Sequence, residues 1–106
     1  IKIKRIYEQP TPDDGYRILV DRLWPRGVRK EFAALDEWNK TIGSHQAERF
    51  QEFSDLYKAE LTSYQDELKR LITIAESNNL TLLYAAKDPK INHAIVLLEV
   101  LESMDA

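Results

Sequence analysis

The sequence contains no cysteine, and this absence excludes several kinds of site. Without thiols the chain can form no disulfide bond, no thiolate metal site and no cysteine nucleophile. A chain that needs no disulfide suits a reducing compartment, so we predict a cytoplasmic location. With only three glycines, the sequence also lacks the glycine-rich loops that cradle nucleotide phosphates in the two common binding motifs.

Long apolar runs and a strong excess of one charge are also missing. No apolar run approaches the roughly 18 residues of a membrane span, so we predict no membrane partner. The net charge of -3 argues against a general nucleic-acid coat, although a local basic patch leaves nucleic acid as an alternative partner. His45 and His93 lie far apart without a carboxylate at ligand spacing, so we predict no metal site. Nothing else in the sequence indicates a cofactor.

The composition is that of one globular domain. The chain has 106 residues, of which 43% are hydrophobic and 31% are charged. A chain of this length normally builds a single hydrophobic core. We therefore predict a single domain over residues 1–106, and the sequence gives no indication of its oligomeric state.

Two strands are predicted near the N-terminus, over residues 1–7 and 16–23. IKIKRIY alternates apolar and basic residues, which is typical of a half-solvated edge strand. YRILVDRL has a continuous apolar centre, which favours a strand covered on both faces. Only eight residues separate the two strands, and a parallel crossover needs a dozen or more. We therefore predict an antiparallel arrangement if they are neighbours.

The second half of the chain predicts helix, strand and helix. Apolar residues spaced three and four apart over 45–77 indicate an amphipathic helix. An unbroken helix would be about 50 Å long, so we predict a break, with Ser54 and Asp55 as the place where a second helix begins. LTLLYAA, at 80–86, predicts a strand. Asp88 as the N-cap and Pro89 at the first position predict a largely buried helix that runs to about Met104. Residues 23–44 fit a short helix or an extended segment equally well.

This order of elements predicts an α/β fold. The strand at 16–23, the helix within 45–77 and the strand at 80–86 form a unit whose two strands are parallel with a right-handed crossover. We expect a small single-domain mixed sheet, mostly parallel with an antiparallel edge strand, flanked by helices.

Polar clusters follow both predicted parallel strands. DRLWPRG follows the first strand and KDPKINHA follows the second. Ligands of open α/β sheets gather beyond the carboxyl ends of parallel strands, and a helix N-terminus there favours an anion. Guanidinium and ammonium groups bind phosphate and carboxylate oxygens. The predicted ligand-binding residues are Arg22, Trp24, Arg26, Lys87, Asp88, Asn92 and His93.

The same residues also fit a purely structural interpretation, and the sequence leaves both open. Asp21 and Asp88 are natural ion-pair partners for the neighbouring cations, and Trp24 suits a hydrophobic core as well as a ligand platform. His93 and Asp88 are the candidate catalytic residues. A lone histidine, however, is more often a packed or capping group than a catalyst.

The segments DGYRILVDRLWPRGVRKE and LTLLYAAKDPKINHAIVLLEVL resemble the YeaO-like family of small bacterial proteins, also called domain of unknown function 488. The resemblance covers almost the whole chain. It implies a small cytosolic bacterial α/β protein. The motif positions that it marks are Arg22, Trp24, Arg26, Lys87, Asp88 and Asn92.

The chain departs from the family pattern in two places. Relatives usually carry a longer connection between LDEW and the long helix, with a His-Asp-Pro turn inside it, whereas the connection around residues 43–50 is short here. Relatives also tend to have histidine where this chain has Ile91. These departures favour an altered or degraded site and weaken the case for catalysis.

Two functional hypotheses follow from these observations. The first is a cytosolic domain that binds a small phosphate- or carboxylate-bearing ligand at the carboxyl edge of its sheet. If it is an enzyme, the expected reaction is hydrolysis or group transfer on that ligand. The second is a non-catalytic interaction module whose basic loop 22–30 contacts nucleic acid or an acidic protein.

Overall fold

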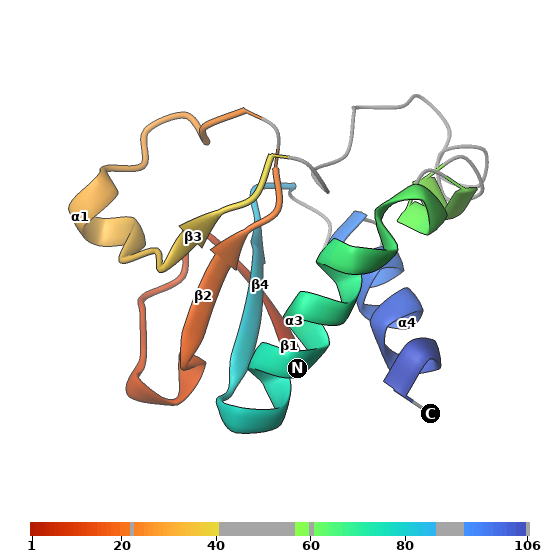
Figure 1. The fold of residues 1–106 in the computed structure, drawn as a ribbon. Helices are drawn as coiled ribbons and strands as arrows, with labels where there is room; N and C mark the ends of the chain where they lie inside the picture. Colours follow the sequence, from red (N-terminus) through yellow and green to blue (C-terminus); the bar gives the residue numbers. More distant parts are fainter. Residues whose placement is uncertain (22, 41–56, 60, 87–92, 106) are drawn as a thin grey trace.

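A computed structural model describes residues 1–21, 23–40, 57–59, 61–86 and 93–105. Its elements alternate between short strands and helices, as expected of an α/β chain (Figure 1). In chain order they are β1 (Lys2–Arg5), the 3-10 helix η1 (Pro12–Asp14), β2 (Tyr16–Leu19), α1 (Lys30–Ala33), β3 (Glu37–Trp38), the 3-10 helix η2 (Thr62–Tyr64), α3 (Gln65–Ser77), β4 (Leu80–Tyr84) and α4 (His93–Asp105).

The four strands form one sheet in the order β1-β4-β2-β3. Strand β4 lies between β1 and β2 and runs parallel to both, with Leu82 opposite Ile3 on one side and Ile18 on the other. Strand β3 extends the sheet beyond β2, again in parallel. The predicted parallel pairing of the strands that begin at Tyr16 and Leu80 is therefore confirmed, and so is the edge position of β1.

The predicted antiparallel edge strand is wrong, because all the described strands are parallel. The prediction assumed that the first two strands are neighbours, but β4 separates them. Residues 6–15 return the chain from the end of β1 to the start of β2 and use η1 in place of a longer crossover helix. The length rule for a parallel crossover therefore misled the prediction in this short connection.

A buried charged cluster fastens this connection to the sheet. The carboxylate of Asp14 is fully buried and accepts hydrogen bonds from Lys4 at 3.2 Å and from Arg17. Lys2 approaches it to 2.9 Å. The basic side chains of β1 are thus partners of a buried carboxylate rather than only a solvated face.

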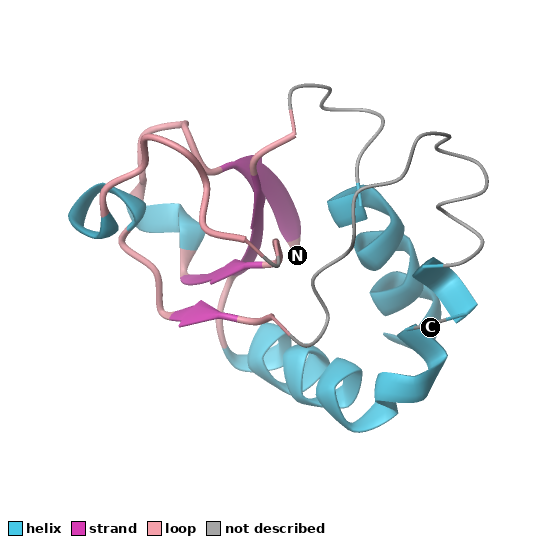
Figure 2. Cartoon of the chain, turned by 90° about the horizontal axis from the view of Figure 1, so that it is seen from above, coloured by secondary structure: helices cyan, strands magenta, loops and turns pink. Residues whose placement is uncertain are grey.

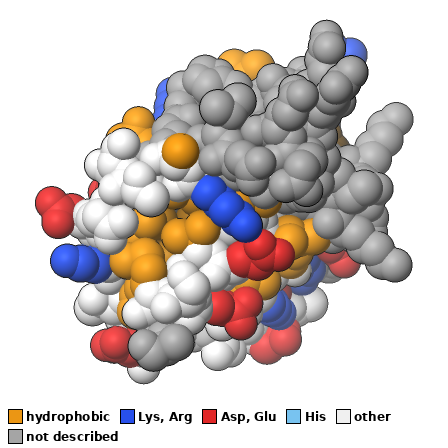
Figure 3. Space-filling view, turned by 90° about the vertical axis from the view of Figure 1, so that its right-hand side faces the viewer, with side chains coloured by type: hydrophobic (Ala, Val, Ile, Leu, Met, Phe, Trp, Pro, Cys, Tyr) orange, Lys and Arg blue, Asp and Glu red, His pale blue; other side chains and the backbone are white. Residues whose placement is uncertain are grey.

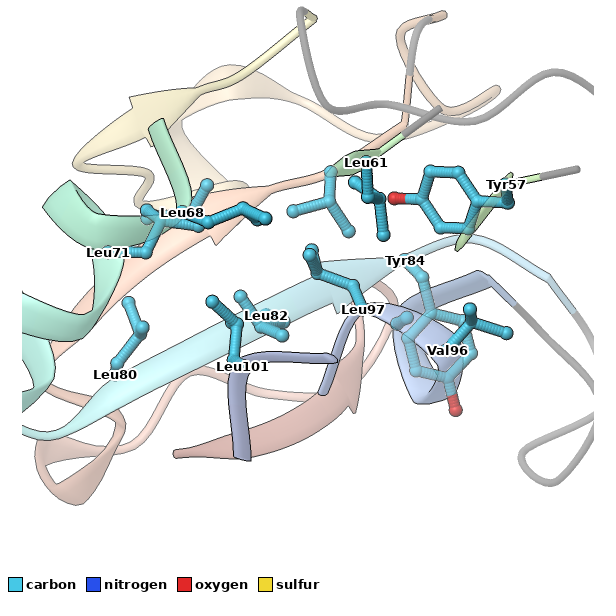
Figure 4. Close-up of a cluster of buried hydrophobic side chains, with 13 residues drawn as sticks. Tyr57, Leu61, Leu68, Leu71, Leu80, Leu82, Tyr84, Val96, Leu97 and Leu101 are labelled. Carbon is cyan, nitrogen blue, oxygen red and sulfur yellow. The ribbon is translucent and has the colours of Figure 1, made fainter. Parts of the chain in front are cut away.

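Hydrophobic side chains cover both faces of the sheet. Helices α3 and α4 lie on one side and α1 lies on the other (Figure 2). The larger cluster lies between the sheet and α3 and α4 (Figure 4), and it includes Tyr57, Leu61, Leu68, Leu71, Leu80, Leu82, Tyr84, Val96, Leu97 and Leu101. The smaller cluster, on the α1 side, contains Ile6, Leu19, Val28, Ala33 and Leu83. Strand β2 is therefore covered on both faces, as predicted.

The helices agree with the sequence where the structure describes them. The 3-10 helix η2 breaks the helical region before α3 begins at Gln65, whereas the predicted restart at Ser54 and Asp55 lies outside the described residues. Helix α3 ends at Ser77, as predicted, and Asn78 after it is extended. Helix α4 ends at Asp105, close to the predicted end, while its predicted start at Asp88 lies outside the described residues.

Candidate functional site

The predicted site depends on two strands that end at the same edge of the sheet, and β2 and β4 do so. They are parallel neighbours, and the chain leaving β2 stays beside β4 because the Val20 amide donates to the Leu83 carbonyl at 3.0 Å. The segments that begin at Asp21 and Ala85 therefore start side by side. The first residues of α4 also lie toward this edge (Figure 1).

Asp21 joins the ends of three strands at this edge. One oxygen of its carboxylate accepts the Ala85 amide at 2.9 Å, which ties the end of β2 to the end of β4. Its carbonyl accepts the indole N–H of Trp38, the last residue of β3, at 2.8 Å. Asp21 therefore fixes the geometry of the edge through hydrogen bonds with backbone and indole groups.

Trp24 packs as a core residue at the start of the loop. Its indole N–H donates to the Val28 carbonyl at 2.8 Å. Its ring meets Trp38 edge to face, with 5.3 Å between centroids, and packs against the smaller hydrophobic cluster. These contacts favour the packing interpretation of Trp24 over a role as a ligand platform.

Arg26 lies on the surface of the same loop. Tyr7 holds its backbone, because the phenol O–H donates to the Arg26 carbonyl at 3.0 Å. The Arg26 side chain is exposed, and no ion pair among the described residues involves it. Of the three cations predicted to bind the ligand, Arg22, Arg26 and Lys87, only Arg26 lies within the described residues.

The other predicted site residues are not placed by the structure. Those outside the described residues are Arg22, Lys87, Asp88 and Asn92, together with Ile91 and the short connection at 43–50. His93 is the first described residue of α4, and only its backbone is described. Their convergence on one ligand remains a prediction.

Arg5 is a cation of this edge that the sequence analysis missed. Its guanidinium group lies across the end of β4 and donates to the Ala86 carbonyl at 2.8 Å and to the Ala85 carbonyl at 3.2 Å. It also lies 5.0 Å from the centre of the Tyr7 ring. The antiparallel prediction for β1 placed its end at the opposite edge, so the sequence pattern could not bring Arg5 to this one.

A second polar cluster links the sheet to α3. Arg70 donates to Glu37 at 2.9 and 2.5 Å and to Glu67 at 2.9 Å. Asn39 donates to both carboxylates at 3.0 Å, and Tyr16 donates to Glu37 at 3.0 Å. Arg70 lowers the pKa of both glutamates, more than their burial raises it. Both carboxylates are therefore held ionised, which suits a structural clamp rather than a general acid.

Two further features of the described residues bear on the site. A shallow hollow lined by Ile1, Lys2, Asp13, Asn79 and Leu80 lies at the opposite, amino-terminal edge of the sheet, so it does not belong to this site. Within the described part of the chain, no group of three or more histidine or carboxylate side chains could hold a metal ion. No described helix is long and apolar enough to cross a membrane.

Comparisons with known proteins place the chain in one family. A family model described as the inactive DUF488-N3 subclade matches residues 1–105. The chain is 46% identical to the uncharacterized protein YeaO of Escherichia coli, over 98% of both chains. It is 34% identical to uncharacterized proteins of Mycobacterium bovis and Mycobacterium tuberculosis, over 95% of this chain and 92% of each relative. No solved structure matches it significantly.

Proposed function

The chain belongs to the inactive DUF488-N3 subclade, and from that premise we propose that it is a non-catalytic domain that binds a small phosphate- or carboxylate-bearing ligand. The ligand would lie at the carboxyl edge of the sheet, between the segments that follow β2 and β4. A nucleotide or another phosphorylated metabolite fits this chemistry.

One observation carries the proposal: β2 and β4 are parallel neighbours, so the basic segments that follow them leave the sheet at one edge. Arg26 is exposed there and pairs with no carboxylate among the described residues. Lys87, Asn92 and the start of α4 would complete the site from the second segment. The departures at 43–50 and Ile91, and the description of the subclade as inactive, favour binding without turnover.

A thermal-shift screen tests this proposal. The panel contains inorganic phosphate, adenine and guanine nucleotides, sugar phosphates and dicarboxylates. A ligand that binds only the folded state, at about 100 times its Kd, adds about 2.7 kcal/mol of stability, so the melting temperature should rise by about 10 °C. We expect NMR spectra of the same mixture to show no conversion of the ligand.

Two matched variants locate the effect. Arg26→Ala should abolish the rise in melting temperature, because it removes an anion contact at the edge. Arg29→Ala removes a second exposed cation of the same loop, next to α1, and should leave the rise intact. Equal loss in both variants, or no ligand in the panel that raises the melting temperature, would contradict the proposal.

A further inference from the structure

Exposed apolar side chains as well as cations lie on and beside the loop that follows β2. Leu23 is 82% exposed, more than any other large apolar side chain of the described residues, and Tyr7 is 42% exposed. Tyr7 lies beside this loop, because its hydroxyl group donates to the Arg26 carbonyl. We call Tyr7, Leu23, Arg26, Arg29 and Lys30 the loop surface.

The backbone beneath this surface is held in place from inside. The Trp24 indole donates to the Val28 carbonyl at 2.8 Å, and the Val28 amide donates to the Pro25 carbonyl at 3.4 Å. Pro25 and Val28 are buried. Hydrogen bonds therefore hold residues 24–28 of the loop in place, which lowers the entropic cost of binding a partner there.

The cations of the loop surface are available for a partner. Arg26, Arg29 and Lys30 are exposed, and no described ion pair involves them. The side of the molecule formed by α3 and α4 differs, because acidic and basic side chains lie next to each other there (Figure 3). One such pair is Lys58 with Glu99, at 3.6 Å. The loop is thus locally positive on a chain with a net charge of -3.

We propose that the loop surface docks an acidic protein segment that carries an apolar side chain. Arg29 and Lys30 would pair with the carboxylates of the partner, while Leu23 and Tyr7 would be buried against its apolar side chain. Tyrosine and arginine are enriched in protein interfaces, whereas a nucleic acid gains little from an aliphatic side chain that has no flat face for base stacking. The proposal goes beyond the ligand site, because it rests on Leu23, Arg29 and Lys30 rather than on Lys87 and α4.

Selection from a random 12-residue peptide library tests the proposal. The full chain serves as bait, and the Arg29→Glu, Lys30→Glu double variant serves for counter-selection. Peptides that combine several acidic residues with leucine or an aromatic residue should be enriched. A synthetic consensus peptide should bind in fluorescence anisotropy, and its affinity should fall as salt rises.

Matched variants separate the possible outcomes. Leu23→Ser and the double variant should each weaken consensus-peptide binding by at least about tenfold. Lys69→Glu should not, since it reverses an exposed cation on α3. No enrichment, peptides without acidic bias, equal binding to the charge-reversed variant, or tighter binding of a 15-residue oligothymidylate would each overturn the proposal. Arg26→Ala combined with a small ligand tests only the ligand site, so the two proposals can fail separately.

Discussion

Gly15 and Gly27 both have a left-handed backbone, but the space around them differs. Gly15 and Gly27 have φ values of 64° and 78°, which L side chains rarely adopt. A Cβ atom at Gly15 would lie 2.3 Å from the Asn79 carbonyl oxygen, whereas nothing lies within 4 Å of one at Gly27. Glycine at position 15 therefore allows the short connection from η1 to pass close to the chain that enters β4.

Alanine at these two positions should cost different amounts of stability. Gly27→Ala should cost about 1–2 kcal/mol, the usual penalty for a left-handed alanine. Gly15→Ala should cost clearly more, because the backbone at Asn79 must move and its 2.8 Å hydrogen bond from the Tyr16 amide is disturbed. Urea unfolding of both variants gives the comparison. Equal losses would mean that the close approach to Asn79 is not rigid.

At the scale of elements, a polar clamp holds the shortest strand. Strand β3 has only two residues and pairs with β2 alone among the described strands. Arg70 of α3 donates to Glu37 of β3 and to Glu67 one turn earlier in its own helix. Asn39 bridges the same two carboxylates. The clamp therefore links α3 to a strand that forms few backbone hydrogen bonds of its own.

Removing the arginine should leave two neighbouring carboxylates without their cation. Arg70→Gln should lower the free energy of unfolding at pH 7 by about 1–2 kcal/mol, a modest value because the group is partly exposed. The pKa values of Glu37 and Glu67 lie below their ordinary 4.5, so the contribution of this pairing is present above about pH 4.5 and is lost as the pH falls below it. The difference from wild type should therefore shrink toward pH 3.

Urea unfolding of wild type and Arg70→Gln between pH 3 and pH 7 measures this difference. Thr73→Val provides a control, because it changes an exposed side chain on the same helix that bonds only within that helix. A difference between wild type and Arg70→Gln that stays constant over the whole pH range would contradict an electrostatic clamp.

The sequence predicted those elements whose pattern spans several residues. The apolar runs of β2 and β4 and the stripe of α3 each repeat often enough to identify the element. Helix α1 and strand β3, with four and two residues, are too short for any period to appear. The direction of β1 was predicted wrongly because it depends on β4, which comes some 75 residues later and inserts beside it.

The sequence likewise predicted only part of the candidate site. Its edge follows from strand direction alone, so the sequence could locate it. The side chains that complete it depend on contacts that no local pattern contains. Trp24 and Trp38 meet only once β2 and β3 pair, and Arg5 reaches the edge only because β1 is parallel to β4.

At the scale of the whole molecule, one buried carboxylate balances several cations. Asp14 is fully buried and receives hydrogen bonds from Lys4, Arg17 and Thr11. Burial alone would raise its pKa, but the hydrogen bonds from Lys2, Thr11 and Lys4 together hold that pKa well below its ordinary value of 3.8. Its ionised form therefore joins β1, η1 and β2.

The sign of this shift predicts how the stability of the molecule depends on pH. A carboxylate whose pKa is lowered by folding stabilises the native state above its unfolded pKa, and the contribution is lost as the pH falls through the folded value. Asp14, Glu37 and Glu67 all shift in this direction. The free energy of unfolding of the wild type should therefore be nearly constant from pH 7 to about pH 5 and should fall steadily below pH 4.

The variant Asp14→Asn measures how much of this pH dependence comes from the Asp14 carboxylate. At pH 7 the variant should lose about 3–5 kcal/mol, because Arg17 and Lys4 remain largely buried without their counter-charge. Below pH 4 its free energy of unfolding should fall less steeply than that of the wild type, so the two curves converge. Asp13→Asn is the matched control, since the neighbouring side chain is exposed and should leave both the value at pH 7 and the slope close to wild type. Parallel pH curves for Asp14→Asn and wild type would show that the buried carboxylate does not set the acid sensitivity of the fold.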